Sequence, residues 1–566
     1  MDINYIHSMY QKWLSSSVVD EIKKNELLSV RDDDKALESR FFSMLEFGTA
    51  GLRGILGAGL NRMNIYTVRH ATQGLASLIK KQGKETHACK RGIAIAYDSR
   101  NMSYEFAIEV CCVMAANGIN SFLFDELRPT PELSYAIRRL KCISGVNITA
   151  SHNPKEYNGY KTYWEDGAQL SLEQADTVFN EMKNVDIFEG VKVFSYEQAK
   201  PFITILNRDF DKFYIEKVLE QSINPEIIKK QHDLKIIYTP FHGTGYRLVP
   251  EVLNLVGFTD VSTVKEQMTR DGNFPTVKSP NPEDKEGFKL AILLAEKQGC
   301  NLIIGTDPDA DRIGVVVKDD KGEFVALTGN QTGIILLNYI ITARKEKGTL
   351  PSNACVIKTI VTSEMAAQIC EKNNVTLMNV LTGFKFIGEK IEEFEEKGNY
   401  TYIFGYEESY GYLAGQYARD KDAVVASMLI AEAAAYYKNK GMSLWETLES
   451  LYKEYGYHVE KTINIAMKGI DGLSRMKEIM NSLRKEPAKE IGGTKVKEFK
   501  DFQNGIMGLP ASNVLYYDMT DNSVLVIRPS GTEPKIKIYI MVKGENRKQA
   551  ESKVDTFEHA FREMIK

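Results

Sequence analysis

The stretch IAIAYDSRNMSYEFAIEVCCVMAANGINSFLF, residues 93–124, decides the fold of this chain. Its short apolar run at 93–96 favours a β-strand, the apolar and small residues at 104–117 favour a helix, and the second apolar run at 121–124 favours another strand. A strand, a helix and a strand in this order are typical of a parallel sheet with helices on its faces. The stretch therefore predicts an α/β architecture.

The same order continues on both sides of this stretch, and it changes only near the end of the chain. Residues 1–40 are charged and helical in pattern, and we expect them to form an N-terminal cap. The tail carries three strand patterns with no helix between them, which predicts an antiparallel α+β unit. Further strands are expected at 145–149, 235–239, 302–305, 356–360, 376–380, 402–404, 514–517, 524–527 and 535–541, and helices at 290–298 and 423–437.

The length of 566 residues corresponds to roughly four domains at about 150 residues each. We expect three tandem α/β domains with mixed, largely parallel sheets, followed by a C-terminal α+β domain. Polar or glycine-containing stretches near residues 205, 322 and 446 are the expected boundaries. The predicted domains are 1–204, 205–321, 322–445 and 446–566.

The composition favours an enzyme and excludes several other classes of protein. Hydrophobic residues make up 43%, charged residues 26%, and the formal charge of −4 provides no basic surface for nucleic acid. The long uncharged stretch that contains residues 326–343 is too polar to span a membrane. The N-terminus lacks a signal-peptide pattern, and the seven cysteines form no CxxC pair. We expect a cytoplasmic protein, monomeric or weakly homo-oligomeric, with no nucleic-acid or membrane partner.

The first chemical motif is TASHNPKEYNGYK, residues 149–161, which follows an expected strand. Active sites of open α/β sheets lie beyond the carboxyl ends of strands. The loop presents Ser151, followed by His152, among turn-forming residues. Ser151 is either a nucleophile, with Lys161 supplying charge or a proton, or simply a capping residue of a polar loop.

The second motif is GTDPDADR, residues 305–312, with aspartates at alternate positions. Pro308 prevents a helix, so Asp307, Asp309 and Asp311 can direct three carboxylates at one point. Such oxygen ligands suit Mg²⁺ or Ca²⁺ better than zinc. The EF-hand pattern fails because Arg312 occupies the place of its glycine. A solvated acidic turn is the alternative, although three like charges repel without a cation.

Two further loops have the composition of sugar and phosphate sites. In GYEESYG, residues 405–411, Glu407 and Ser409 stand two apart and can point the same way toward sugar hydroxyls. An exposed acidic loop is an equal alternative. In IRPSGTEPK, residues 527–535, Arg528 offers a planar fork for phosphate, and the following residues offer hydroxyl and backbone N–H groups. A plain hairpin turn is the alternative. The chain has neither a nucleotide P-loop nor an HExxH zinc motif.

These four motifs, together with FGTAGLRG at 47–54, resemble in order those of the α-D-phosphohexomutases, the phosphoglucomutases and phosphomannomutases. The resemblance runs from about residue 40 onward. It implies four domains arranged around a central cleft, each contributing one loop. It also implies an enzyme that transfers phosphoryl groups within sugar phosphates.

The resemblance implies that Ser151 carries a phosphoryl group and that Asp307, Asp309 and Asp311 hold Mg²⁺ together with a phosphoserine oxygen. The phosphoserine gives its group to a sugar monophosphate, and the resulting glucose 1,6-bisphosphate returns its other phosphate. Lys421, in RDKD at 419–422, matches a proposed acid/base slightly better than Lys161 does. The other implied residues are Arg53 and Arg312 at the phosphoryl group, Thr382, Gly383, Glu407 and Ser409 at the sugar, and Arg528, Ser530, Gly531 and Thr532 at the second phosphate.

The loop form GYEESYG, which lacks the histidine of GExSGH, resembles the glucose branch of the family. It also resembles a branch that includes phosphopentomutases, so phosphopentomutase and phosphomannomutase activities stay open. A catalytically silent sugar-phosphate binding protein would be expected to lose the serine, an aspartate or the clamp arginine, but this chain has all of them. A metal-dependent phosphatase would have no use for a second phosphate clamp.

Overall fold

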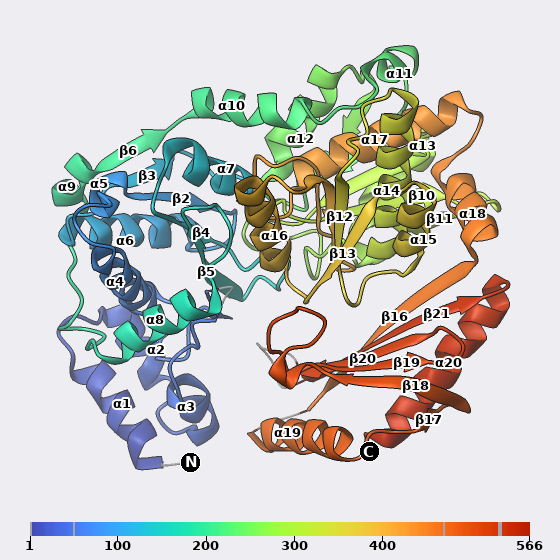
Figure 1. Ribbon diagram of the computed structural model, residues 1–566. Helices are drawn as coiled ribbons and strands as arrows, with labels where there is room; N and C mark the ends of the chain where they lie inside the picture. Colours follow the sequence, from blue (N-terminus) through green and yellow to red (C-terminus); the bar gives the residue numbers. More distant parts are fainter. Residues whose placement is uncertain (1–2, 49–50, 468–469, 530–534, 566) are drawn as a thin grey trace. The chain divides into compact units, whose positions relative to one another are not determined.

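The computed structural model describes residues 3–48, 51–467, 470–529 and 535–565 (Figure 1). Contacts between Cα atoms divide the chain into two compact units, each made of separate segments. Unit 1 comprises Met1–Val316, Gly388–Glu396 and Gly411–Glu432. Unit 2 comprises Val317–Ile387, Lys397–Tyr410 and Ala433–Lys566. Four sheets run through the described residues, three of them with parallel strands.

The N-terminal segment consists of three short helices, α1 (Ile3–Ser15), α2 (Glu21–Leu28) and α3 (Asp34–Phe41). The side chains of Asp20 and Asp33 cap α2 and α3 by accepting hydrogen bonds from backbone N–H groups. Trp13 is fully buried and packs edge-on against Tyr66 and Phe188. The expected N-terminal cap thus has an apolar cluster that joins it to the first sheet's helices.

The first sheet has the strand order β1-β5-β4-β2-β3-β6. The decisive stretch 93–124 forms β2, α6 and β3, with β2 parallel to β3 and to β4. Strands β5 and β1 extend the sheet antiparallel. The elements are β1 (Leu52–Ile55), α4 (Ile65–Lys81), α5 (Ala88–Arg91), β2 (Ile93–Tyr97), α6 (Ser103–Ala116), β3 (Ser121–Phe124), α7 (Thr130–Leu140), β4 (Ser144–Ile148), β5 (Tyr157–Trp164), α8 (Leu172–Lys183), α9 (Tyr196–Ala199) and β6 (Ile203–Leu206).

The second sheet has the order β11-β10-β9-β7-β8, with β7 parallel to β8 and β9. Strand β9 is buried along its whole length, as expected of a strand covered on both faces. The elements leading to and forming this sheet are α10 (Arg208–Leu219), α11 (Pro225–Lys230), β7 (Ile236–Thr239), α12 (Gly245–Val256), β8 (Val261–Thr263), α13 (Lys289–Gln298), β9 (Leu302–Thr306), β10 (Ile313–Lys318) and β11 (Phe324–Ala326).

The third sheet has the order β13-β12-β14-β15, with β12 parallel to both β13 and β14. Its elements are α14 (Gly329–Glu346), β12 (Ala354–Thr359), α15 (Met365–Lys372), β13 (Thr376–Val380), α16 (Phe384–Lys397), β14 (Thr401–Tyr406), β15 (Tyr412–Leu413), α17 (Ala423–Asn439) and α18 (Leu444–Tyr455).

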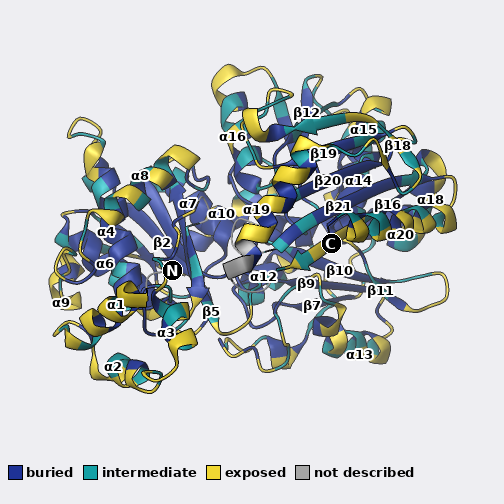
Figure 2. Ribbon diagram, turned by 90° about the horizontal axis from the view of Figure 1, so that it is seen from below, coloured by how far each residue is buried: buried dark blue, intermediate teal, exposed yellow. Residues whose placement is uncertain are grey.

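The fourth sheet is antiparallel throughout, in the order β16-β21-β20-β19-β18-β17. Side chains of β20 alternate: Leu525 and Ile527 join the core shared with α19 and α20, while Val524 and Val526 join the cluster that holds Leu381. Figure 2 shows β20 and β21 largely buried and the outer faces of both helices exposed. The elements are β16 (Tyr457–Ala466), α19 (Ile470–Lys485), β17 (Glu490–Ile491), β18 (Thr494–Asp501), β19 (Leu515–Met519), β20 (Val524–Pro529), β21 (Lys535–Gly544) and α20 (Arg547–Met564).

The predicted fold class, three α/β domains followed by an α+β domain, is confirmed. Residues 157–161, expected in a loop, instead belong to the buried strand β5. The turn-forming pair Asn158-Gly159 hides this strand in the sequence. Lys161 is therefore held in the sheet, where its register partner is Asn147.

Candidate phosphoryl-transfer site

Ser151 lies just beyond the carboxyl end of β4 and is only 2% exposed. Its backbone is left-handed, with φ of 52°, and its N–H donates to Thr149 Oγ1 at 2.9 Å. Its Oγ donates to Asp307 Oδ2 at 2.9 Å and lies 3.2 Å from His152 Nδ1. Left-handed backbone at a residue other than glycine is unfavourable and is often found at functional sites. The predicted nucleophile is thus fixed beside the acidic motif.

The three aspartates of the acidic motif are buried in the turn between β9 and β10. Asp307 Oδ1 accepts from the backbone N–H groups of Asp311 and Arg312 at 3.1 and 3.0 Å. The Oδ1 atoms of Asp309 and Asp311 have no hydrogen-bond partner among the described residues. Ligand oxygens of all three aspartates lie within 4.8 Å of one another, so this group has the oxygen donors for a divalent cation.

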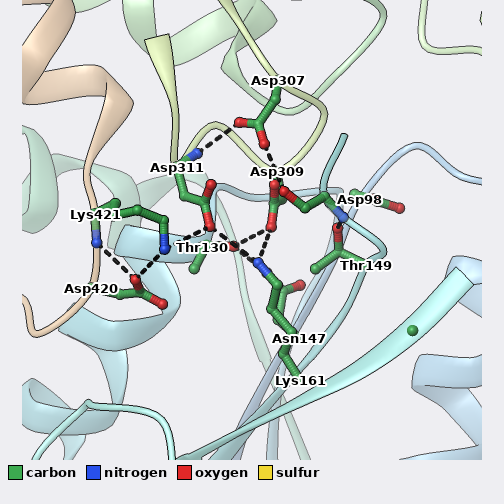
Figure 3. A network of polar contacts seen from close by, with 12 residues as sticks. Asp98, Thr130, Asn147, Thr149, Lys161, Asp307, Asp309, Asp311, Asp420 and Lys421 are labelled. Carbon is green, nitrogen blue, oxygen red and sulfur yellow. Dashed lines mark hydrogen bonds and ion pairs between the residues drawn. The ribbon is translucent and has the colours of Figure 1, made fainter. Parts of the chain in front are cut away.

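Two lysines from different parts of unit 1 meet the acidic motif (Figure 3). Lys161 Nζ donates to Asp309 at 2.6 Å and to Asp311 at 3.1 Å. Lys421 Nζ lies 3.4 Å from Asp311 and 2.8 Å from Asp420. Both candidate proton handlers therefore contact the same carboxylate.

Burial and neighbouring charges oppose each other in their effects on the pKa values of Asp311 and Lys161, whereas both raise the pKa of Asp307. Burial opposes ionisation of Asp311, but Lys161, Lys421 and Arg312 outweigh it and hold the pKa of Asp311 below its ordinary value. Burial, then the charges of Asp309 and Asp311, raise the pKa of Asp307. Burial alone would lower the pKa of Lys161, but the negative charges of Asp309 and Asp311 outweigh burial and raise it.

Sequence reasoning missed a second layer of residues behind these side chains (Figure 3). Thr130, at the start of α7, donates its hydroxyl to Asp309 Oδ2 at 2.9 Å and its N–H to Asp309 O at 2.9 Å. Asn147 Nδ2 in turn donates to that hydroxyl at 2.7 Å. Asp420 accepts from Tyr163 at 3.0 Å. Polar residues at strand ends and helix starts were the available signal, but their partners are far away in sequence.

The two arginines predicted at the phosphoryl group also lie by these loops. Arg53, in β1, donates to Asn153 Oδ1 at 3.0 Å in the serine loop. Arg312 Nε lies 3.7 Å from Asp311. His152 is kept neutral, because burial and then the charges of Arg312 and Arg53 lower its pKa well below the ordinary range.

Unit 2 gathers most of the predicted sugar and phosphate residues that the structure describes. Glu407 is buried, and its Oε1 accepts from the N–H of Gly383 at 2.9 Å. Arg528 Nη1 donates to Thr382 Oγ1. Ser409 is partly exposed in the same loop as Glu407. Ser530, Gly531 and Thr532 lie outside the described residues.

Glu408, which was not predicted as a site residue, lies among these groups. Its carboxylate accepts from Thr359 Oγ1 at 3.3 Å. Burial and then the charge of Glu407 raise its pKa to about 7, against the opposing effect of Arg528 and Lys537. The carboxyl group is thus set to titrate near neutral pH.

Comparisons with known proteins agree with this arrangement. Three family profiles, described as phosphoglucomutase/phosphomannomutase alpha/beta/alpha domains I, II and III, match residues 44–187, 212–322 and 328–455. The phosphoglucomutase of Staphylococcus aureus strain MSSA476 is 36% identical over 526 residues, which is 91% of this chain and 92% of that protein. The chain belongs to the α-D-phosphohexomutase family, as the five motifs predicted, and is an enzyme of the isomerase class.

Solved structures share the fold. The phosphoglucomutase parafusin from Paramecium, in its open form, has a TM-score of 0.67 at 17% identity, covering 92% of this chain and 94% of its own. The N-acetylphosphoglucosamine mutase of Aspergillus fumigatus, in complex with GlcNAc-6P and magnesium, has a TM-score of 0.52 at 14% identity, covering 93% and 97%. No helix among the described residues is long and apolar enough to cross a membrane.

Proposed function

We propose that this chain is a phosphoglucomutase that interconverts glucose 1-phosphate and glucose 6-phosphate through a phosphoserine at Ser151. The observation that carries the proposal is the hydrogen bond of 2.9 Å between Ser151 Oγ and Asp307, within the buried group of three aspartates. A phosphoryl relay needs a hydroxyl held beside a cation site, because most of the catalysis is positioning and electrostatic stabilisation, and three carboxylates beside the hydroxyl could hold such a cation.

Asp307, Asp309 and Asp311 are the proposed ligands of Mg²⁺. The Oδ1 atoms of Asp309 and Asp311 fit this role, since they are buried and accept no hydrogen bond from the described residues, and a buried carboxylate oxygen without a hydrogen bond is costly. A bound Mg²⁺ would offset negative charge on the transferring phosphoryl group. Arg53 is proposed to support the same group through its contact with the serine loop.

Lys421 is the proposed proton handler, and Lys161 the residue that fixes the acidic motif. Lys161 donates to two carboxylates at 2.6 and 3.1 Å, so its protons are engaged. Lys421 lies further from Asp311, at 3.4 Å, and its second partner is Asp420. Loss of a proton from Lys421 would therefore disturb the acidic motif less than loss of one from Lys161, and Lys421 is proposed to exchange a proton with a sugar hydroxyl.

In unit 2, Glu407 is proposed to read sugar hydroxyls and Arg528 to bind the phosphate that does not react. The sugar contacts are proposed to be completed by Ser409, Thr382 and Gly383. Arg312 is proposed to contact the substrate as well. The phosphate contacts are proposed to be completed by Ser530, Gly531 and Thr532. The proposed intermediate is glucose 1,6-bisphosphate. We also propose a cytoplasmic location and a monomeric or weakly oligomeric state. The proposed four domains have their boundaries near residues 205, 322 and 446.

A coupled assay tests the proposal. Glucose 1-phosphate with catalytic glucose 1,6-bisphosphate should be converted faster than mannose 1-phosphate or ribose 1-phosphate. A faster rate with ribose 1-phosphate would assign the chain as a phosphopentomutase instead. Ser151→Ala should abolish turnover, because no other hydroxyl is proposed to carry the phosphoryl group. Ser77→Ala is a matched control, because the Ser77 hydroxyl donates only to the Gln73 carbonyl within helix α4.

A further inference from the structure

Arg100 follows β2 and is buried, with no exposed side-chain surface. A buried guanidinium is costly unless its N–H groups are paired. Its Nε lies 3.2 Å from Asp98 Oδ2, and the ring of Phe274 lies 5.1 Å from its Cζ. Asp98 is itself fixed, because its Oδ1 accepts from Ser103 Oγ at 2.8 Å. The guanidinium therefore has a set position and orientation.

The other N–H groups of Arg100 bind the backbone of the serine loop. Nη2 donates to the carbonyl oxygens of Ser151 and Asn153, at 2.5 and 2.6 Å. Nη1 donates to those of Pro154 and Tyr157, at 2.9 and 3.1 Å. One planar side chain thus binds four carbonyl groups between Ser151 and Tyr157, the first residue of β5, and buried carbonyl groups must be paired.

We propose that Arg100 is a positioning residue that holds Ser151 in the conformation needed for phosphoryl transfer. Ser151 has the unfavourable φ of 52°, which persists only where surrounding contacts fix it. The four carbonyl contacts supply that constraint from one side, and the N–H of Ser151 bonded to Thr149 supplies it from the other. Arg100 contacts no reacting atom, so its effect is on the placement of the Ser151 hydroxyl beside Asp307.

A lysine at position 100 keeps the positive charge but cannot reproduce the planar fork. A displacement of about 1 Å at a reacting atom costs on the order of a hundredfold in rate. We expect Arg100→Lys to lower kcat about 10- to 100-fold, with KM for the sugar phosphate changed less than about threefold, because the proposed substrate contacts are untouched. Intact-mass measurements should show Ser151 accepting a phosphoryl group from glucose 1,6-bisphosphate more slowly by a similar factor.

Arg91→Lys is the matched control. Arg91 also binds two backbone carbonyls, those of Lys141 at 2.8 Å and Cys142 at 3.3 Å, but none of the serine loop. Its variant should keep wild-type kcat and phosphorylation rate. An unchanged kcat in Arg100→Lys, or an equal loss in Arg91→Lys, would overturn the proposal.

If Arg100→Lys does not fold, Asp98→Asn decides the matter, because it removes the charge that orients the Arg100 guanidinium and so misaligns its contacts with the four carbonyl groups. We expect a kcat reduced about tenfold at a nearly unchanged melting temperature, and a wild-type kcat would refute the role. The inference rests on the proposed function. Wild-type protein inactive with every sugar phosphate would defeat that function, whereas active wild-type protein with an unaffected Arg100→Lys would defeat only the role of Arg100.

Discussion

Replacing Thr130 by valine tests the second layer of the acidic motif. The change keeps the shape of the side chain and the backbone bond to Asp309 O, and removes the hydroxyl that donates to Asp309 Oδ2 at 2.9 Å. A hydrogen bond to a charged group contributes about 1.5–3 kcal/mol. Lys161 still donates to the same oxygen at 2.6 Å, so the carboxylate keeps that partner but is less well oriented.

Loss of such an outer partner typically lowers metal affinity about 10- to 100-fold, which matches the hydrogen-bond energy at about 1.4 kcal/mol per factor of ten. The Mg²⁺ concentration giving half-maximal activity should therefore rise by this factor in Thr130→Val, and calorimetric titration of Mg²⁺ should show the same shift. Thr332→Val is the matched control, because the buried Thr332 hydroxyl has no hydrogen-bond partner among the described residues. Coinciding Mg²⁺ curves for Thr130→Val and wild type would refute the reasoning.

Four further outcomes are expected. Arg528→Ala should raise KM for the sugar phosphate about 10- to 100-fold with a smaller change in kcat, and an unchanged KM would place the phosphate clamp elsewhere. Because the pKa of Glu408 is raised from 4.5 to about 7, this carboxyl gains a negative charge beside Glu407 as pH rises through 7. Because this charge repels the substrate phosphate, KM for the sugar phosphate should increase between about pH 6 and 8 more in wild type than in Glu408→Gln. Parallel plots of KM against pH for the two proteins would contradict this expectation. The same shift means that the folded chain holds a proton that the unfolded chain releases, so this carboxyl makes the chain less stable as pH rises from 4.5 to 7. Lys161→Met should lower stability by about 3–5 kcal/mol in chelator, with partial recovery in Mg²⁺, because it removes the ion pair of the buried Asp309 and one of those of Asp311. Equal urea midpoints for variant and wild type in chelator would exclude this expectation.

The sequence predicted the parts of this protein that depend on local pattern. Apolar runs alternating with helical segments were enough for the three α/β sheets, and the missing helices between the last strands were enough for the antiparallel one. Strand β5 was missed because the turn-forming pair Asn158-Gly159 masks a buried strand.

Local sequence pattern could not predict the residues that lie behind the acidic motif and the serine loop. Thr130 and Asp309 are 179 positions apart, and Arg100 and Ser151 are 51 apart. Neither pairing leaves a trace in spacing or composition. Arg100 and Ser151 meet because β2 and β4 are neighbours in the first sheet, and Thr130 meets Asp309 because the start of α7 contacts the turn between β9 and β10 of the second sheet. Asp307, Asp309 and Asp311 were found because one turn holds all three.

The pairing of Lys161 with the acidic motif also bears on how the molecule is made. Lys161 precedes Asp309 and Asp311 by 148 and 150 positions, so its ammonium group is already present when the ribosome adds the aspartates. Domains generally fold in the order of their synthesis. The turn that holds the three aspartates therefore forms when the ammonium group of Lys161 is already present, whereas Lys421 is synthesised later. A fragment that begins after residue 205 would bring the three carboxylates together without Lys161, and should close this turn less readily than the full chain unless a divalent cation is present.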